Sequence, residues 1–168
     1  MDPLLVNVAE LLRRPGNDKD ISTVVSAEDI QLDDPRIARD AQVTVAAHLE
    51  SMADGIVVTA RLGVPWHDTC RRCLTDVDEN VDVTVRELYQ VVVTDHDAFP
   101  IVGEQIDLSE MTRAAVLLEL PLAALCRTDC AGFCPECGTN RNEAPCSCAP
   151  VRTDDRWSAL DALRGQLN

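Results

Sequence analysis

Eight cysteines in four close pairs constrain this chain more than any other feature of its 168 residues. Four thiolates around a zinc ion lie about 3.8 Å from one another, a spacing that two cysteines separated by two or three residues reach within one turn of backbone. Each pair can therefore supply half of a four-cysteine site, and we expect two zinc ions. The predicted ligands are Cys70, Cys73, Cys126, Cys130, Cys134, Cys137, Cys146 and Cys148.

The start of the chain and its hydropathy predict the chemical state of these thiols. The first residues lack the positive charge that opens a secretory signal peptide, and charges such as Glu119 interrupt the apolar stretches before they reach membrane-spanning length. We therefore expect a cytoplasmic protein with no membrane contact. Cytoplasmic thiols are kept reduced, which favours metal binding over a disulfide framework.

Four pairs can be combined into two sites in three ways. We favour a local site formed by the four cysteines between 134 and 148, because so short a segment closes on itself at little entropic cost. By elimination, the other four form a long-range site that joins residues 70–73 to residues 126–130. By analogy with a covalent cross-link, that site would stabilise the fold by about 4 kcal/mol. A cross-braced arrangement of the same pairs remains open.

The residues around the cysteines refine this prediction. Gly138 directly follows Cys137, where a positive φ would turn backbone amides toward the sulfurs. Cys146 and Cys148 are separated by one residue, so the backbone must bend there for both to reach one ion. A redox-active pair would normally open a helix, whereas Cys70 is expected to follow a strand and a turn at 67–69. His67 is expected to lie in that turn without binding metal.

Hydrophobic periodicity predicts an α+β fold. Apolar residues alternate over 43–49 and 56–64 on either side of an Asp54-Gly55 turn signal, which predicts an antiparallel hairpin that ends at Pro65. Alternation resumes over 81–93, so we expect three or four strands in a partly closed antiparallel sheet. A helix that begins near Asp107 and stops before Pro121 is expected to cover one face. Its predicted apolar stripe consists of Leu108, Met111, Ala115 and Leu118.

The two ends of the chain are expected to be less regular. Residues 1–35 predict a short helix over 8–13, capped by Asn7, then loop and a solvated acidic connector at 28–34. We expect a first part at 1–125, which holds the sheet and its helix, and a second part at 126–168. The second part is expected to be a zinc-ribbon-like segment followed by a terminal helix. The apolar stripe of that helix would be Trp157, Leu160, Leu163 and Leu167.

The charge balance limits the partners that the protein can have. There are 15 basic and 29 acidic residues, for a formal net charge of -14, which repels phosphate backbones and excludes a general DNA-coating protein. Aromatic residues make up only 3%, too few for the stacking platforms that grip single-stranded RNA. We therefore expect the arginines near the cysteines to offset thiolate charge locally. They are Arg71, Arg72, Arg127 and Arg141.

Three segments together form a specific pattern. They are Cys70-Arg71-Arg72-Cys73-Leu74, Leu120-Pro121-Leu122 ahead of Cys126, and Asp129-Cys130-Ala131-Gly132-Phe133-Cys134-Pro135-Glu136-Cys137-Gly138 followed by Asn140, Asn142, Cys146 and Cys148. Over residues 40–160 the chain resembles the bacterial YceD family of large ribosomal RNA subunit accumulation proteins. Arg141 departs from the family, which usually has an apolar residue between the two asparagines.

The resemblance implies a role in ribosome biogenesis. Some family members lack the C-terminal cluster yet keep the counterparts of Cys70, Cys73 and the ligand-type positions 126 and 130, which supports two separate sites. The family gene commonly lies next to that of a small basic ribosomal protein. Together with the acidic charge, this predicts a non-enzymatic factor that supports 23S rRNA accumulation by binding a basic ribosomal protein or a precursor of the large subunit. A direct rRNA-binding zinc module is the alternative, and a thiol oxidoreductase is a third possibility.

Overall fold

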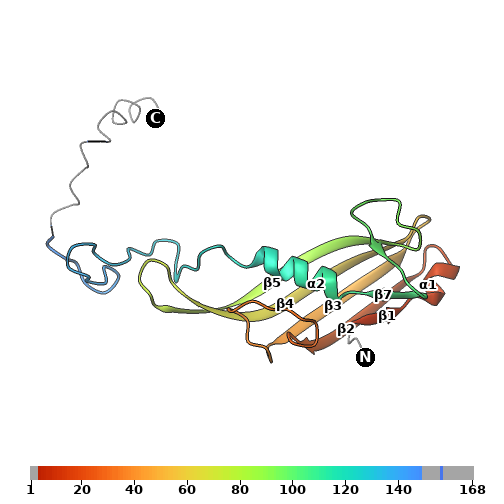
Figure 1. Ribbon diagram of the computed structural model, residues 1–168, viewed down its shortest axis with the longest axis horizontal. Coiled ribbons are helices and arrows are strands. Elements are labelled where there is room, and N and C mark those ends of the chain that lie inside the picture. Colours follow the sequence, from red (N-terminus) through yellow and green to blue (C-terminus); the bar gives the residue numbers. More distant parts are fainter. Residues whose placement is uncertain (1–3, 149–155, 157–168) are drawn as a thin grey trace.

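The computed structural model describes residues 4–148 and Arg156, and one five-stranded sheet dominates them (Figure 1). Its order is β2-β3-β4-β5-β6, and every neighbouring pair is antiparallel except β5 and β6. The strands are β2 (Asp18–Ser26), β3 (Gln42–Ser51), β4 (Ile56–Thr69), β5 (Asp76–Gln90) and β6 (Phe99–Pro100). The expected α+β class and antiparallel hairpins are confirmed. Partial closure of the sheet is not observed, since β2 and β6 lie at opposite edges.

The central hairpin follows directly from the alternation in the sequence. Apolar side chains on one face of β3 and β4 are buried, while the intervening positions of β3 face solvent. The predicted Asp54-Gly55 turn is confirmed: Ser51 pairs with Ile56, and the Met52 N–H donates to the Gly55 carbonyl over 2.8 Å. A two-residue period with one buried face fixes the strand register, because a slip by one residue would expose every core side chain.

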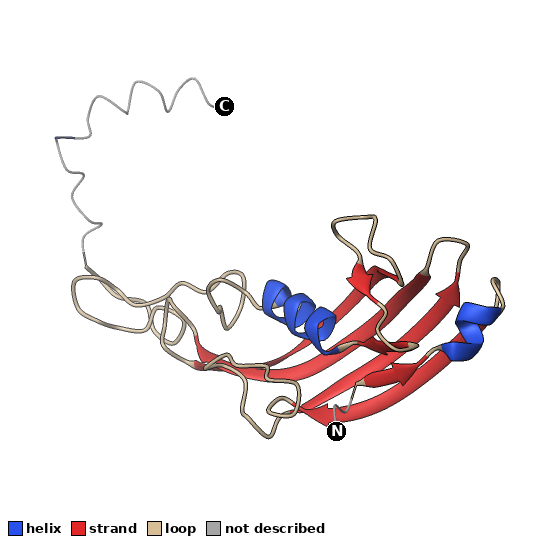
Figure 2. Ribbon diagram, turned by 45° about the vertical axis from the view of Figure 1, so that its right-hand side comes forward, coloured by secondary structure: helices blue, strands red, loops and turns tan. Residues whose placement is uncertain are grey.

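The predicted helix covers the buried face. Helix α2 (Ser109–Glu119) lies over β4 and β5, and a small sheet of β1 (Leu5–Asn7) and β7 (Gln105–Asp107) covers more of the same face (Figure 2). The buried stripe contains Leu108, Met111, Thr112, Ala115 and Val116. Leu118 was expected in that stripe but is 87% exposed. With 3.6 residues per turn, it lies at the margin of a stripe centred on Leu108 and Ala115.

Strands β4 and β5 differ from the prediction at their ends. β4 does not stop at Pro65 but continues to Thr69, so His67 lies in a strand and not in a turn. The pairing of β3 with β4 ends at Gly63, and the next N–H on that side, from His67, donates to the Arg36 carbonyl. Pro65 therefore removes a donor only where β3 has no partner for it. β5 begins at Asp76 and ends at Gln90, leaving residues 91–93 as exposed loop.

The segment before β3 is more ordered than expected. Residues 18–26 were interpreted as loop but form the edge strand β2, paired with β3 along its whole length. The connector at 28–34 is only partly solvated, because Ile30 and Leu32 are buried in the core. Its Asp34 accepts from Arg36 at 2.8 Å, and Arg36 also donates to the Pro121 carbonyl at 2.7 Å. This connector therefore ties β2 to the end of α2.

The sequence also predicts a helix near each end of the chain. Helix α1 spans Ala9–Arg13, one residue shorter than expected, and its N-cap is Val8 and not Asn7. The Asn7 side chain still accepts from the Ala9 N–H at 3.1 Å. The expected terminal helix at 157–167 lies outside the described residues. None of the helices within the described part of the chain is long and apolar enough to cross a membrane.

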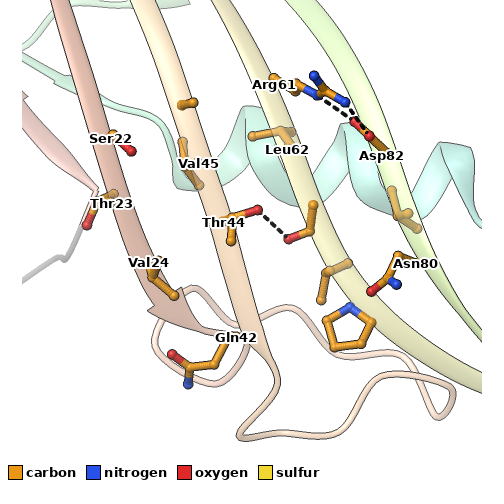
Figure 3. A pocket seen from close by; sticks show the side chains of 15 residues that line it. Ser22, Thr23, Val24, Gln42, Thr44, Val45, Arg61, Leu62, Asn80 and Asp82 are labelled. Carbon is orange, nitrogen blue, oxygen red and sulfur yellow. Dashed lines mark hydrogen bonds and ion pairs between the residues drawn. The ribbon is translucent and has the colours of Figure 1, made fainter.

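The face of the sheet opposite α2 is open and carries cross-strand charge pairs (Figure 3). Figure 3 shows Arg61 of β4 against Asp82 of β5, where the shorter contact is 2.6 Å, and the Thr44 hydroxyl donating to the Gly63 carbonyl. Two histidines form similar pairs, His48 with Asp20 and His67 with Asp78, each at 2.8 Å. The register of β2 on β3 brings Asp20 opposite His48.

These pairs predict a measurable pH dependence. The hydrogen bond to Asp20 raises the pKa of His48 above its usual 6.5. A group whose pKa is higher in the folded state stabilises the fold below its unfolded pKa, and this contribution is lost as pH rises through the folded value. Asp20→Asn should bring the pKa of His48 back toward 6.5 in an NMR titration and leave His67 unchanged. Asp78→Asn should lower the pKa of His67 and leave that of His48 unchanged. If Asp20→Asn did not change the pKa of His48, the pairing of His48 with Asp20 would be contradicted.

Candidate metal centres

The eight cysteines form two groups of four in the structure. Within each group the four sulfurs all lie within 4.8 Å of one another. The first group contains Cys70, Cys73, Cys126 and Cys130, and the second contains Cys134, Cys137, Cys146 and Cys148. This is the favoured grouping, and the cross-braced arrangement is not observed. The Cys70 and Cys130 sulfurs are 3.8 Å apart, close to the edge of about 3.8 Å of a four-thiolate zinc tetrahedron.

The first tetrad begins in a tight loop between β4 and β5. The Cys70 N–H donates to the Thr75 carbonyl and the Leu74 N–H donates back to the Cys70 carbonyl, each over 2.8 Å. Leu74 has a φ of 56°, in the left-handed region that L-residues rarely adopt. This loop therefore has the shape of a metal-binding knuckle, in which backbone amides surround a pair of cysteines.

The second tetrad repeats the same backbone path. The Cys134 N–H donates to the Thr139 carbonyl and the Gly138 N–H to the Cys134 carbonyl, each over 2.9 Å. Gly138 has a φ of 71°, which confirms the conformation that the sequence predicted for it. It occupies the position that Leu74 holds in the first loop. Both tetrads are thus built on one local structure, although only the second has the glycine that makes it recognisable.

A threonine follows the second cysteine of each knuckle by two residues. The Thr75 hydroxyl lies 3.3 Å from the Cys73 sulfur, and the Thr139 hydroxyl lies 3.2 Å from the Cys137 sulfur. The sequence reasoning did not single out either threonine. The repeated spacing Cys-x-x-Cys-x-Thr was the available signal, and its chemical basis is a hydroxyl that hydrogen-bonds to a thiolate.

The surroundings of the sulfurs lower some cysteine pKa values and raise others within each tetrad. Hydrogen bonding from the Cys126 backbone lowers the pKa of Cys70 to about 6, and Thr139 lowers the pKa of Cys137 to about 6. Conversely, the neighbouring Cys73 sulfur raises the pKa of Cys126 to about 12, and the Cys137 sulfur raises that of Cys148 to about 12. Four thiolates in such proximity repel one another, so a cation is what would let all four ionise together.

The first tetrad joins distant parts of the chain. Cys70, Cys73 and Cys130 are buried with the hydrophobic core, while Cys126 is exposed. The knuckle is fastened to the segment after α2 by backbone bonds of 3.0 Å from Arg71 N–H to the Ala124 carbonyl and from Phe133 N–H to the Arg72 carbonyl. Figure 1 shows this segment running from α2 past the β4–β5 loop.

Asn142 connects the two tetrads. It lies between the second and third cysteines of the C-terminal group, yet its side-chain amide is 3.4 Å from the sulfur of Cys130 in the first group. Its carbonyl oxygen accepts from the Ala131 N–H and from Arg127, each over 2.8 Å. The sequence pattern contained Asn142 without a role for it; the structure makes it a positioning residue between the two groups.

The four neighbouring arginines have different roles. Arg72 donates to the Cys130 carbonyl at 2.9 Å, and Arg127 pairs with Asp129 at 3.3 Å. These contacts are with oxygens near the cysteines, so compensation of thiolate charge by the two arginines stays a prediction. The side chains of Arg71 and Arg141 are exposed and form no hydrogen bond or ion pair with another described residue. Local hydrogen bonds and ion pairs therefore engage two of the four arginines.

Two other groups of potential ligands occur in the described residues. Asp18 and Asp20 of β2 lie beside His48 of β3, and Asp95, His96 and Asp97 lie together in a loop. All six are exposed, and both groups contain His–Asp ion pairs.

Comparison with known proteins assigns the chain to a family. The family model described as large ribosomal RNA subunit accumulation protein YceD matches residues 58–164, a range that includes all eight cysteines. The chain belongs to the YceD family. The family description refers to an effect on ribosomal RNA and not to a class of enzyme.

Relatives occur in mycobacteria and in plants. An uncharacterized protein of Mycobacterium tuberculosis is 34% identical over 98% of this chain and 86% of its own length, and one of Mycobacterium leprae is 34% identical over 95% and 77%. The Arabidopsis thaliana protein named large ribosomal RNA subunit accumulation protein YCED homolog 1, chloroplastic, is 36% identical over 41% of this chain and 22% of its own length. No solved structure matches the chain.

Two matched variants test the grouping of the cysteines. Cys126→Ser and Cys137→Ser each alter one exposed sulfur, the first in the long-range tetrad and the second in the local one. We expect each to lower the bound zinc from two ions to one per chain, measured by native mass spectrometry. Cys126→Ser should cost more stability, up to about 4 kcal/mol in denaturant unfolding, because it opens the longer loop. Loss of both ions from either variant would contradict two independent sites.

The glycines of the knuckle region provide a second test. A Cβ on Gly138 would meet nothing within 4 Å, so Gly138→Ala should cost only the left-handed strain, about 1 kcal/mol. A Cβ on Gly132 would lie 2.9 Å from the Arg72 carbonyl oxygen, at a residue that also has a positive φ of 66°. Gly132→Ala should therefore destabilise the protein distinctly more in thermal unfolding. Equal losses would show that Gly132 and Arg72 are not in contact.

Proposed function

We propose that this YceD family protein is an assembly factor for the large ribosomal subunit that acts in the cytoplasm. It binds a basic ribosomal protein or a precursor of the large subunit and so supports the accumulation of 23S rRNA. Two zinc ions, one in each cysteine tetrad, hold its structure. The observation that carries this proposal is the family match across the full set of cysteines, which the fold gathers into two four-sulfur groups.

The donor set supports a structural and not a catalytic zinc. Four thiolates complete a tetrahedral shell, whereas catalytic zinc sites keep one position for water or substrate. Two of the predicted ligands of the first tetrad lie before the proposed boundary between residues 125 and 126, and two lie after it. An ion bound there would therefore link the two parts of the chain. A thiol oxidoreductase needs free thiols, so full zinc occupancy without thiol exchange activity would exclude that alternative.

The surface charge supports a basic partner. The net charge is -14, and five acidic residues are exposed on the open face of the sheet. They are Asp18, Asp20, Glu50, Asp76 and Asp78. A negative surface steers positively charged proteins toward it and repels nucleic acid. A protein of this kind is suited to shield a basic ribosomal protein until rRNA displaces it.

One observation favours a second candidate, direct contact with rRNA. Arg71 and Arg141 both project from the cysteine-rich end without a described partner. They are cations available for phosphate contacts. Under this candidate, the double variant Arg71→Ala with Arg141→Ala would abolish a gel shift with a precursor 23S rRNA fragment, while Arg86→Ala on the acidic sheet face would preserve it.

Cosedimentation distinguishes the two candidates. The protein is expected to sediment with precursor large subunits, or to co-purify with a basic ribosomal protein, at low salt and to dissociate steeply as salt rises, because the attraction between exposed charges is screened. The Arg71 and Arg141 variant should behave like the unaltered protein. Failure of the zinc-loaded protein to associate at low salt would overturn the proposed function.

A further inference from the structure

We propose that the free edge of β2 binds an extended, basic segment of a partner protein as an added β-strand. The proposal deepens the proposed function, on which it rests for the identity of the partner as a component of the large subunit. The strand addition itself rests on the hydrogen-bonding geometry of β2, on the sequence of that strand and on the charges beside it.

The pairing of β2 with β3 determines which backbone groups remain free. The Ala27 N–H donates to the Ala41 carbonyl, and the Ser51 N–H donates to the Asn17 carbonyl, so odd-numbered residues of β2 exchange hydrogen bonds with β3. In an antiparallel pair the alternate residues direct their N–H and C=O groups to the other side. Asp20, Ser22 and Val24 therefore present unpaired backbone groups along the outer edge, where no described residue bonds to them.

This edge lacks most of the devices by which proteins prevent strand addition. β2 is nine residues long, and its second half, Ser22–Ser26, contains no charge, proline or glycine. Val24 in this stretch is 54% exposed. The opposite edge strand, β6, is only two residues long. Long unprotected edges pair readily with other chains, and an extended peptide that adds to such an edge gains main-chain hydrogen bonds.

The side chains beside the edge define the chemistry of the added strand. Asp18 and Asp20 project from the first half of β2 onto the open sheet face, and Glu50 lies opposite Asp18 on β3. The ammonium of the neighbouring Lys19 donates a hydrogen bond to the Asn7 carbonyl. Lysine or arginine on the same face of the added strand would pair across strands with the aspartates. Beside Ser22 and Val24, uncharged residues fit better.

The open face next to this edge has room for side chains of the added strand. A shallow cavity of about 450 Å³ lies over the sheet between β2 and β5, lined in part by Ser22, Val24, Thr44 and Gly63 (Figure 3). The sheet surface is hollowed here because these side chains are small and Gly63 has no side chain. A side chain of the added strand that extends over β2 would therefore contact this open surface, with no other side chains in its way.

A suitable probe is a peptide as long as β2 that has lysines only at the open-face positions beside Asp18 and Asp20 and uncharged residues such as valine at its other positions. It should bind the full-length, zinc-loaded protein in fluorescence anisotropy at low salt. Hydrogen exchange read by NMR should slow at the amides of Asp20, Ser22 and Val24 and remain unchanged at Thr23 and Val25, which already bond to β3. Protection at another surface, or no binding of the peptide, would overturn the proposal.

Matched variants and peptides separate strand addition from charge attraction. Ser22→Pro and Val24→Pro remove an outward N–H, a change that an edge strand tolerates, and each should weaken binding about fivefold. Val92→Pro, in an exposed loop, should have no effect. The same peptide with N-methyl groups on its bonding edge keeps its charge and should lose binding; equal affinity would overturn strand addition. Circular dichroism and zinc content confirm that each variant is folded.

The remaining outcomes are equally decisive. Self-association of the protein through β2, detected by light scattering and abolished by Ser22→Pro, would show that the edge serves a second copy of this chain and would overturn the proposal. Slowing of the same amides by rRNA alone would overturn it in favour of a nucleic-acid edge. If precursor subunits still cosediment with Ser22→Pro and Val24→Pro proteins, the proposed function stands and the edge inference falls. If the wild-type protein binds the peptide but no ribosomal component, the edge inference stands and the proposed function falls.

Discussion

The structure of this protein depends on the meeting of four sulfurs from two segments that lie more than fifty residues apart in the chain. Cys70 and Cys73 come from the tip of the β4–β5 hairpin, and Cys126 and Cys130 from the chain beyond α2. Val77 of the hairpin and Ala124 of the segment beyond α2 are buried in the hydrophobic core. Shared ligation would add to that burial, since metal binding to a site absent from the unfolded chain contributes directly to folding. The C-terminal tetrad is then positioned by bonds to the first, through Arg72, Phe133 and Asn142.

The sequence predicted the grouping of the cysteines but not the structural repetition between the two knuckles. Proximity along the chain favours the local tetrad, and the second tetrad follows by elimination, so loop entropy was a sufficient guide. Gly138 marked the second knuckle because glycine is the residue expected at a positive φ. Leu74 occupies the equivalent position in the first knuckle against its own preference, so composition could not reveal it. Tertiary contacts maintain that conformation: the Cys70 sulfur and the Arg72 carbonyl are both held by the segment after α2.

The same contrast explains which strands were predictable. β3 and β4 bury one full face, so their apolar residues alternate and give a clear signal. β2 lies at an edge, where only Val25 is fully buried, and its sequence therefore resembles loop. Pro65 indicated a strand end because a proline cannot donate, yet β4 continues past it, beyond the last residue that pairs with β3. Leu118 fitted the helical spacing but lies beyond the part of α2 that faces the sheet. Each difference arises where a neighbour, and not the local sequence, decides the structure.

An acidic surface and an open strand edge have complementary physical roles in the proposed binding. Charge attraction acts over roughly 10 Å at moderate salt and accelerates encounter, but it selects only for the sign of the partner's charge. Main-chain bonds along β2 require an extended partner but little sequence identity. A basic segment held in this way keeps its affinity for rRNA, whose phosphates carry a much higher charge density than a few carboxylates. Under the proposal, the protein would therefore not need a conformational change to release its partner, because rRNA would compete for the lysines and arginines themselves. Loss of that electrostatic contribution would leave a short set of backbone hydrogen bonds, each worth about 1 kcal/mol. In this proposal the zinc ions would take no part in the exchange, so binding and release could occur while the cysteine-rich end stays folded.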